Sequence, residues 1–263
     1  MADLELKVLG CHGGETARHR TSSFLLGDRL ALDAGAATGT LTLEEQRRID
    51  AVLVSHAHMD HVRDLASLAD NRCQQGGPPI EVVGTPGTIA TLREHFFNDA
   101  LWPDFTRIRC CEEGPVVVYR EVGMEEPVEV LGHRVTAIPV DHTIESAAFL
   151  VEKDGAAIAY SGDTGPTDRL WEVLGETPHL RGLIMEVSFP DEMAELARVS
   201  GHHTPSTLQQ DLRKLRGHDE LPIFLFHIKP AFESAVERQL ARLREERHLV
   251  LLQLEDTFLL GER

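Results

Sequence analysis

The sequence is poor in positive charge. Lys and Arg number 26 against 43 Asp and Glu in 263 residues, which gives a formal net charge of −17. A protein that grips long nucleic acid by its phosphates needs a basic surface, so the deficit argues against that class of partner. It leaves room for a small anionic substrate, because bound divalent cations make a site locally positive whatever the surface charge.

Long apolar runs are also missing. No stretch approaches the roughly 18 apolar residues that a membrane-spanning helix needs. The acidic start, residues 1–5, has no basic segment followed by an apolar one, so we expect no secretory signal. These absences predict a soluble, cytoplasmic protein without a membrane partner.

Cysteines are few and unpaired in sequence. None of the four forms a Cys-x-x-Cys pair, which argues against a thiolate zinc site. Four cysteines in a chain of this length do not suggest a disulfide scaffold, and we expect four reduced thiols: Cys11, Cys73, Cys110 and Cys111.

The chain does contain many short apolar or alternating runs, which predict strands. The predicted strands are Leu4–Leu9, Ser22–Leu26, Leu30–Asp33, Ala51–Val54, Glu81–Gly84, Val116–Tyr119, Val128–Leu131, His133–Pro139, Ala147–Lys153, Ala156–Ser161, Gly182–Glu186, Ile223–His227, Leu249–Leu252 and Thr257–Leu260. Helical patterns lie between some of them, at Val62–Asn71, Thr88–Phe97, Pro205–Leu215 and Ala231–Glu246. The acidic stretch Glu121–Glu129 is predicted to be a loop or hairpin. We expect one α/β domain over residues 1–263, with two sheets and outer helices.

Histidine is abundant, with 14 residues, and three of these histidines lie together in one short segment. Directly after the apolar run Ala51–Val54 come His56, His58, Asp60 and His61. Residues two apart on an extended segment reach the same side, so the first two can share one metal. The next pair falls where a helix begins, which suits a second metal. Imidazole and carboxylate donors fit Zn²⁺, Fe²⁺ or Mn²⁺ better than Ca²⁺ or Mg²⁺.

Four donors are too few for two metals, since each ion takes three or four protein ligands. Three further candidates, His142, Asp163 and His227, each follow a predicted strand. Strand ends are where α/β folds place their sites. On its own, each of these residues has an ordinary reading as a turn or strand-end residue, and the joint pattern carries the prediction.

The motif His56-x-His58-x-Asp60-His61, followed in order by the three later donors, resembles the metallo-β-lactamase superfamily over nearly the whole chain. The resemblance implies a four-layer αβ/βα sandwich. The likeness is nearest to class II 3′,5′-cyclic-nucleotide phosphodiesterases, through residues 8–14, 32–35, 92–105, 201–205 and 226–230. Two residues depart from the family pattern, because His203 and Met59 stand where leucine is usual, and this puts the exact substrate in doubt.

The resemblance implies that His56, His58 and His142 hold one metal, that Asp60, His61 and His227 hold the other, and that Asp163 bridges them. A hydroxide shared by two ions, most simply Zn with Fe or Mn as alternatives, would cleave cAMP or cGMP to the 5′-nucleotide. Asp60 counts among the catalytic residues for this reason. The family also implies a homodimer.

His202 is the candidate for protonating the leaving 3′ oxygen or binding a phosphate oxygen, with a surface histidine before a helix as the alternative. Lys229 either attracts the phosphate or is simply solvated. Asp33 is expected to support a ligand histidine, with Thr21 and Ser22 as weaker candidates. Residues 102–104 either pack at the surface or form a subunit contact. The remaining histidines are interpreted as structural or exposed: His12, His19, His95, His133, His179, His218 and His248.

Other functions remain open. A tRNA 3′-processing nuclease or another phosphodiesterase of the superfamily shares the ligands, but the nuclease needs a basic surface or an arm to hold tRNA. A thioester or lactam hydrolase fits residues 201–205 less well. A protein that binds a cyclic nucleotide without cutting it is disfavoured, because such a protein has no need of a complete set of metal ligands.

Overall fold

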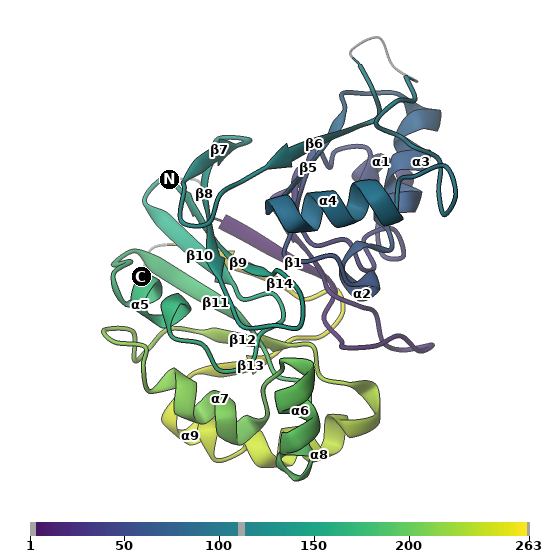
Figure 1. Ribbon diagram of the computed structural model, residues 1–263. Helices are drawn as coiled ribbons and strands as arrows, with labels where there is room; N and C mark the ends of the chain where they lie inside the picture. The colour runs from purple at the N-terminus through teal and green to yellow at the C-terminus, as the bar shows by residue number, and fades with distance from the viewer. Residues whose placement is uncertain (1–3, 110–113, 262–263) are drawn as a thin grey trace.

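Two facing β-sheets form the centre of the molecule, and helices cover both outer faces (Figure 1). The computed structural model describes residues 4–109 and 114–261. Each sheet has seven strands, in the order β14-β1-β2-β3-β4-β5-β6 and β13-β12-β11-β10-β9-β8-β7. The resulting layers, helix–sheet–sheet–helix, are those of the predicted four-layer sandwich.

The first sheet contains β1 (Leu4–Gly10), β2 (Ser23–Leu26), β3 (Leu30–Leu32), β4 (Ala51–Val54), β5 (Ile80–Gly84), β6 (Val117–Glu121) and β14 (Thr257–Leu260). The second contains β7 (Val128–Val130), β8 (His133–Pro139), β9 (Ala147–Lys153), β10 (Ala156–Tyr160), β11 (Leu180–Glu186), β12 (Ile223–Phe226) and β13 (Leu249–Leu251). In both sheets part of the order is parallel, β3 to β6 in one and β10 to β13 in the other. Parallel strands end at the same edge, so residues that follow them are brought together.

The helices form one group on each sheet. Beside the first sheet lie α1 (Leu43–Gln46), α2 (Met59–Val62), α3 (Leu65–Gln75) and α4 (Pro86–His95). Beside the second lie α5 (Arg169–Gly175), α6 (Ala194–Ser200), α7 (Pro205–Leu212), α8 (Glu233–Leu240) and α9 (Leu243–Glu246), with short 3₁₀ turns at Asp191–Met193 and Pro230–Phe232. No helix in the described ranges is long and apolar enough to cross a membrane.

Apolar side chains from both sheets fill the space between them. Phe24 of the first sheet meets Tyr160 and Phe226 of the second edge to face, with ring centroids 5.5 and 5.4 Å apart. Such offset ring contacts add to the stabilisation from apolar burial. This core holds the two sheets in a fixed relationship, so the strand ends that carry polar residues are fixed as well.

Every predicted strand has a counterpart within two residues at each end. The helices are less well predicted. The expected helix Val62–Asn71 is split between α2 and α3, and Ala231–Glu246 is split between α8 and α9, while α1, α5 and α6 were not expected. The three missed helices have seven residues or fewer, so they show too few turns for an apolar period to stand out.

One prediction about the cysteines is wrong. Cys11 is a free, buried thiol, as expected, but Cys73 is disulfide-bonded. Cys110 and Cys111, for which reduced thiols were also predicted, lie outside the described residues. The error arose because sequence spacing alone does not show which cysteines the fold brings together.

Candidate metal centre

The first group of donors lies where β4 passes into α2. The chain is still extended at His58, which is the N-cap of α2 with φ −68° and ψ 147°. Residues two apart on an extended segment point to the same side, so His56 and His58 converge. The first turn of α2 then carries Asp60 and His61 toward a neighbouring point. The local conformation therefore divides four adjacent donors into two pairs.

The remaining donors arrive from the second sheet. His142 follows β8, Asp163 follows β10 and His227 directly follows β12. The backbone of His227 has φ +69°, a left-handed conformation that is uncommon outside glycine. Its N–H donates to the Cys11 carbonyl over 2.7 Å, which helps to hold this conformation. Four chain segments thus supply one site.

The first cluster consists of three imidazoles. His58 Nδ1 lies 3.0 Å from His56 Nε2 and 3.2 Å from His142 Nε2. Metal–nitrogen bonds of about 2.0–2.1 Å in a tetrahedral arrangement place neighbouring ligand atoms about 3.3 Å apart. The three nitrogens therefore already have the spacing of ligands around one ion.

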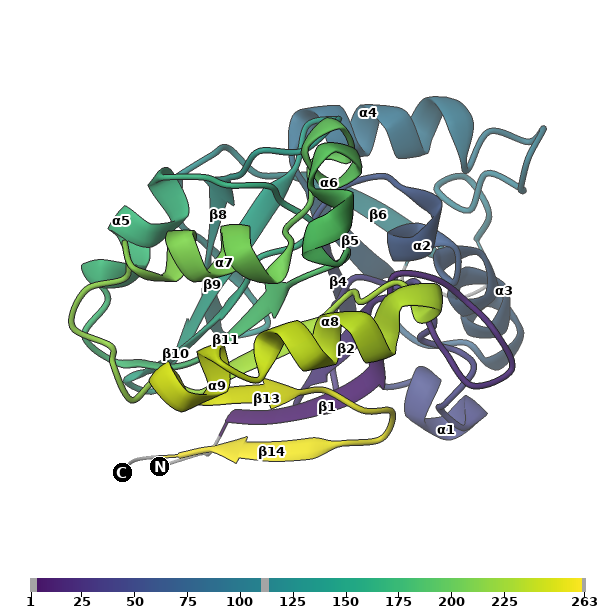
Figure 2. The same cartoon turned by 90° about the horizontal axis from the view of Figure 1, so that it is seen from below.

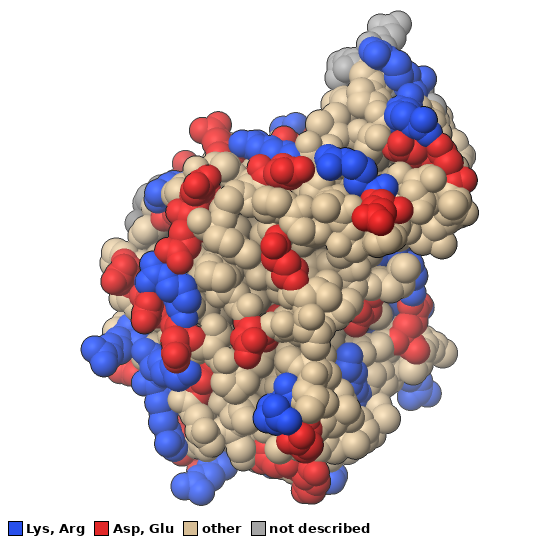
Figure 3. All heavy atoms as spheres, viewed as in Figure 1, with Lys and Arg blue, Asp and Glu red and all other residues tan. Residues whose placement is uncertain are grey.

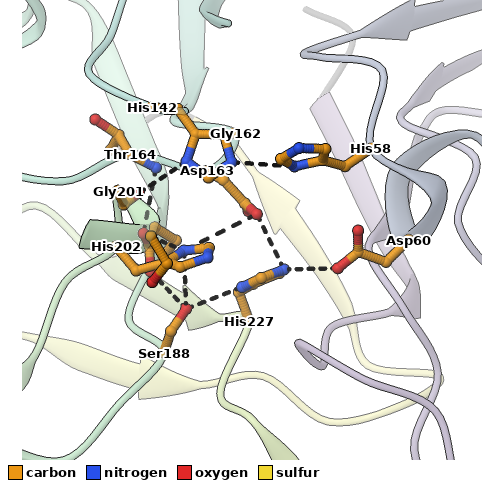
Figure 4. A network of polar contacts seen from close by, with 12 residues as sticks. His58, Asp60, His142, Gly162, Asp163, Thr164, Ser188, Gly201, His202 and His227 are labelled. Atoms are coloured by element: carbon orange, nitrogen blue, oxygen red, sulfur yellow. Dashed lines mark hydrogen bonds and ion pairs between the residues drawn. The ribbon is translucent and has the colours of Figure 1, made fainter. Parts of the chain in front are cut away.

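The second cluster combines imidazoles with carboxylates (Figure 4). His227 Nε2 lies 3.4 Å from His61 Nε2, 3.3 Å from Asp60 Oδ2 and 3.2 Å from Asp163 Oδ2. The other oxygen of Asp163 lies 3.2 Å from His61 Nε2. Asp163 Oδ2 is also 3.8 Å from His56 Nε2, so this carboxylate stands between the two clusters.

The hydrogen bonds around the histidines fit metal binding. His61 Nδ1 lies 2.6 Å from the Asp33 carboxylate, and His142 Nδ1 lies 2.8 Å from the Gly201 carbonyl. A ring that donates through Nδ1 keeps Nε2 for a metal, which is the usual arrangement of ligand histidines. Asp163 Oδ1 is buried and, apart from its ion-pair contact with His61 Nε2, has no hydrogen-bond partner among the described residues, a costly state that a cation would relieve. The residues present therefore fit two transition-metal ions.

The electrostatics of the site favour positive charge. Burial opposes a charged imidazole, yet Asp163 and Asp33 together raise the pKa of His61 well above its usual value. Burial likewise opposes an ionised Asp163, yet His227 and His61 hold its pKa well below the normal range. A similar balance lowers the pKa of Asp60, where burial is outweighed by the hydrogen bond from His227. The two carboxylates are therefore held in the charged form that attracts a cation, and the raised pKa of His61 reflects the same negative surroundings.

Asp33 directly follows β3 and contacts one of the donor histidines, as the sequence predicted. Its Oδ1 accepts from the Ser55 N–H over 2.7 Å, and its Oδ2 accepts from Tyr160 Oη over 2.5 Å. The same Oδ2 contacts His61. One fully buried carboxylate therefore orients a ligand histidine and ties both sheets together.

A buried acid that the sequence did not reveal lies behind the donors. Glu186, the last residue of β11, places Oε1 3.1 Å from His202 Nδ1 and Oε2 3.0 Å from Ser188 Oγ. Ser188 Oγ in turn contacts His227 Nδ1 at 2.9 Å. Burial, reinforced by Asp163, raises the pKa of Glu186 to about 7. In the sequence, Glu186 is only a single acidic residue at the end of an apolar strand, and no periodic pattern distinguishes it.

His202 lies beside the donors, as its sequence position suggested. Its ring stacks on His227 with centroids 5.2 Å apart, and its Nδ1 is 4.0 Å from Asp163 Oδ2 (Figure 4). The residue is buried, so the alternative of a surface histidine is wrong. Burial, opposed by Asp163 and reinforced by Lys229, lowers the pKa of His202. His202 is therefore a buried imidazole within reach of the reaction centre.

In the part of the chain that the structure describes, the other residues considered in the sequence make no contact with the donor clusters that would show the role considered for them. The hydroxyls of Thr21 and Ser22 are buried without a hydrogen-bond partner among the described residues, so the prediction that they support a ligand histidine is wrong. His203 is directed into α7, where its Nδ1 contacts Thr207 Oγ1 at 3.0 Å. Lys229 is half-buried and forms no ion pair within the described ranges. Trp102 forms an isolated backbone β-bridge with Phe97, and 39% of its surface is exposed. Whether it serves in surface packing or in a subunit contact stays a prediction.

Comparison with known protein families supports the fold and the motifs. The model of the Beta-lactamase superfamily domain matches residues 29–228, which include all seven donors, and the chain belongs to this family. The crystal structure of unliganded yeast PDE1 superposes with a TM-score of 0.82 at 20% identity, covering 99% of this chain and 100% of the other. The architecture is the metallo-β-lactamase fold.

Two relatives carry names that describe an activity. A Yersinia pestis protein named probable 3′,5′-cyclic-nucleotide phosphodiesterase is 27% identical, over 97% of this chain and 84% of its own length. A ribonuclease Z of Kineococcus radiotolerans is 28% identical, over 83% of this chain and 77% of its own length. Both relatives align with most of the chain, so they support the two leading interpretations of the sequence.

Proposed function

We propose that this member of the β-lactamase superfamily is a dinuclear metal-dependent phosphodiesterase that hydrolyses 3′,5′-cyclic nucleotides to 5′-nucleotides. The observation that carries the proposal is a pair of donor clusters joined by Asp163, with a buried imidazole, His202, beside them. The near full-length similarity to a protein named as a cyclic-nucleotide phosphodiesterase supports the choice of substrate.

The residues divide between two ions in a simple way. One ion would be held by His56, His58 and His142, the other by Asp60, His61 and His227, with Asp163 shared. Zn²⁺ suits these donors best, with Fe²⁺ and Mn²⁺ as alternatives. When bound, two such ions supply a hydroxide nucleophile near neutral pH and neutralise charge on the phosphoryl oxygens. The catalytic contribution of Asp60 would come from its place in the second cluster.

His202 would assist departure of the ribose 3′ oxygen. Its Nδ1 is engaged by Glu186 and Ser188, at 3.1 and 3.3 Å, so the ring is fixed and Nε2 is left for the substrate. An alkoxide is a poor leaving group, and a positioned acid typically contributes 10²–10⁴-fold to such a step. Binding a phosphate oxygen is the second role open to the same nitrogen.

Lys229 would contribute charge rather than a fixed contact. It follows the donor His227 by two residues, and its positive charge helps to lower the pKa of both His227 and His202. A cation that acts on both rings is near enough to attract a phosphodiester. This long-range attraction weakens with added salt, because exposed charges are screened over about 10 Å at 0.1 M ionic strength.

A tRNA-processing nuclease is the second candidate, supported by the ribonuclease Z relatives. The charge of the chain disfavours it, because phosphate contacts along an RNA need clustered Lys and Arg. On the face seen in Figure 3, basic side chains are interspersed with acidic ones and form no continuous basic surface. A small substrate is therefore preferred. Cytoplasmic location and a homodimer stay predictions.

A substrate panel tests the proposal. The metal-loaded protein is mixed separately with cAMP, cGMP, bis(p-nitrophenyl) phosphate and a tRNA precursor. We expect release of 5′-nucleotide from at least one cyclic nucleotide. Cleavage of the precursor alone would favour the nuclease, cleavage of the nitrophenyl ester alone would leave a phosphodiesterase of unknown substrate, and no cleavage with both metals present would defeat the enzyme interpretation.

A further inference from the structure

A second group of potential metal ligands lies outside the centre described above. It consists of His12 and His19, both in the loop between β1 and β2, and Glu233, the first residue of α8. Figure 2 shows this loop running beside the start of α8. Residues more than 200 positions apart in sequence are thus brought to one point.

The three side chains converge through the atoms that bind metals. His12 Nε2 lies 3.7 Å from Glu233 Oε1, and His19 Nε2 lies 3.3 Å from Glu233 Oε2. The imidazole rings meet edge to face with centroids 4.6 Å apart. Ligand atoms around a tetrahedral zinc ion are about 3.3 Å apart, so small side-chain movements would complete the arrangement.

The opposite nitrogen of each ring is already held in place. His12 Nδ1 lies 3.3 Å from the Arg20 carbonyl, and His19 Nδ1 contacts Thr16 Oγ1 at 2.5 Å. Ligand histidines almost always use their second nitrogen in such a contact, which orients the ring and fixes its tautomer. Both rings are therefore anchored through Nδ1, and both direct Nε2 at the same carboxylate. Surface residues that meet by chance rarely form such an ordered set of ligands.

We propose that His12, His19 and Glu233 bind a third metal ion, a mononuclear Zn²⁺ separate from the dinuclear centre. Two imidazoles and one carboxylate are a donor set that zinc accepts, and three protein ligands leave one position for water or a small molecule. The side chains of His12 and His19 are 12% and 17% exposed and that of Glu233 is 41% exposed, so an ion reaches them from solvent.

A cavity beside the three side chains leaves room for a non-protein ligand on the ion. The nearest candidate for a fourth protein ligand, Cys11, is directed away from it. A cavity of about 310 Å³ is lined by all three residues and by Glu237. The Cys11 thiol also lines it, but Sγ lies 3.7 Å from His12 Nδ1, on the far side of the ring, and donates to the Leu252 carbonyl.

The third ion would fasten a segment that supports the dinuclear centre. The Cys11 carbonyl accepts from the His227 N–H over 2.7 Å, and the Gly13 N–H donates to the Ile228 carbonyl over 3.1 Å. An ion on His12, between these two bonds, would tie the β1–β2 loop to α8 directly beside a donor of the centre. Its role would be structural, because none of its ligands belongs to either of the two clusters that form the centre.

Metal content of the purified, zinc-loaded and desalted protein tests the proposal. We expect three zinc ions per chain in the wild type and two in His19→Ala and in Glu233→Gln, measured by mass spectrometry of the metal. Circular dichroism confirms that each variant is folded. Glu237→Gln is the matched control, because it removes the same charge one helical turn along α8 and lines the same cavity. It should keep three ions.

A variant with an emptied centre separates this site from the hydrolase proposal. In a chain carrying His61→Ala and His142→Ala, we expect one ion to remain at micromolar zinc, and the addition of Glu233→Gln to remove it. Equal zinc content in wild type and His19→Ala, or the same loss in Glu237→Gln, would overturn the third site. None of these results depends on turnover of a nucleotide.

Discussion

Nδ1 of His202 lies 3.1 Å from Oε1 of Glu186, and both side chains are buried. The contact comes from two elements, the end of β11 and the segment before α7. It gives a buried imidazole a carboxyl partner directly behind the two donor clusters, an arrangement that orients the ring. Two predictions follow from it, one for each residue.

Replacement of the imidazole tests its part in the reaction. His202→Ala should lower kcat for a cyclic nucleotide about 10²–10⁴-fold, because a positioned proton donor is lost. Metal content should stay at the wild-type value, since His202 is not required by either donor cluster. His95→Ala, an exposed histidine on α4, is the control and should turn over normally. Wild-type kcat in a metal-replete His202→Ala protein would refute the role.

The pH profile tests Glu186. Its pKa is raised to about 7, mainly by burial, so it is neutral below that pH and charged above it. A charged partner stabilises the protonated form of His202, the form that donates a proton, although burial lowers the pKa of this ring. The kcat of the wild type should therefore fall as pH rises and His202 loses its proton. In Glu186→Gln this fall should begin at a lower pH and leave the variant about 10-fold slower at pH 8, on the order of one charge-assisted hydrogen bond. An unchanged profile would show that Glu186 is only structural.

Asp33 should control metal affinity. Asp33→Asn keeps the size of the side chain and tolerates the left-handed backbone of this residue, φ +54°. It removes the charge that His61 Nδ1 contacts, and loss of such a partner typically costs 10–100-fold in metal affinity. Competition with a chelator measures this change. Asp28→Asn, at an exposed turn, is the control, and equal affinity in both variants would contradict the account.

Gly35 allows the chain to approach Asp60 closely. A Cβ atom at this position would lie 1.9 Å from the Asp60 carbonyl oxygen and 2.8 Å from the Ser22 carbonyl oxygen. Gly35→Ala should therefore destabilise the fold by about 1–3 kcal/mol and displace Asp60 from the second cluster. At Gly39 the nearest atom would be 3.7 Å away, so Gly39→Ala is the control. Equal melting temperatures and metal content in the two variants would disprove the close approach.

The sequence predicted those parts of the site that depend on local pattern. His56 to His61 were evident because four donors fall within six residues after an apolar strand. His142, Asp163 and His227 followed from strand ends and from the order of the family motifs. The fourteen strands were found because each buries side chains with a short, continuous or alternating pattern, whereas α1, α5 and α6 are too short to show a period.

What the sequence did not predict depends on distant partners. Glu186 is one acid at a strand end, and only the fold places it against His202. Likewise His12 and His19 were interpreted as structural or exposed residues, because Glu233, the group on which they converge, is more than 200 residues away. Pairs far apart in sequence leave no spacing that could reveal them.

Hydrolysis of cAMP in ¹⁸O-labelled water tests the central claim most directly. The wild type, loaded with zinc, and Asp163→Asn, which loses the carboxylate between the two clusters, are compared under the same conditions. We predict that the wild type forms 5′-AMP with one ¹⁸O atom on phosphorus and that the variant forms at least 100-fold less, on the order of the loss of an essential electrostatic group. No product from either cAMP or cGMP, 3′-AMP as the product, or equal rates for the two proteins would contradict the account.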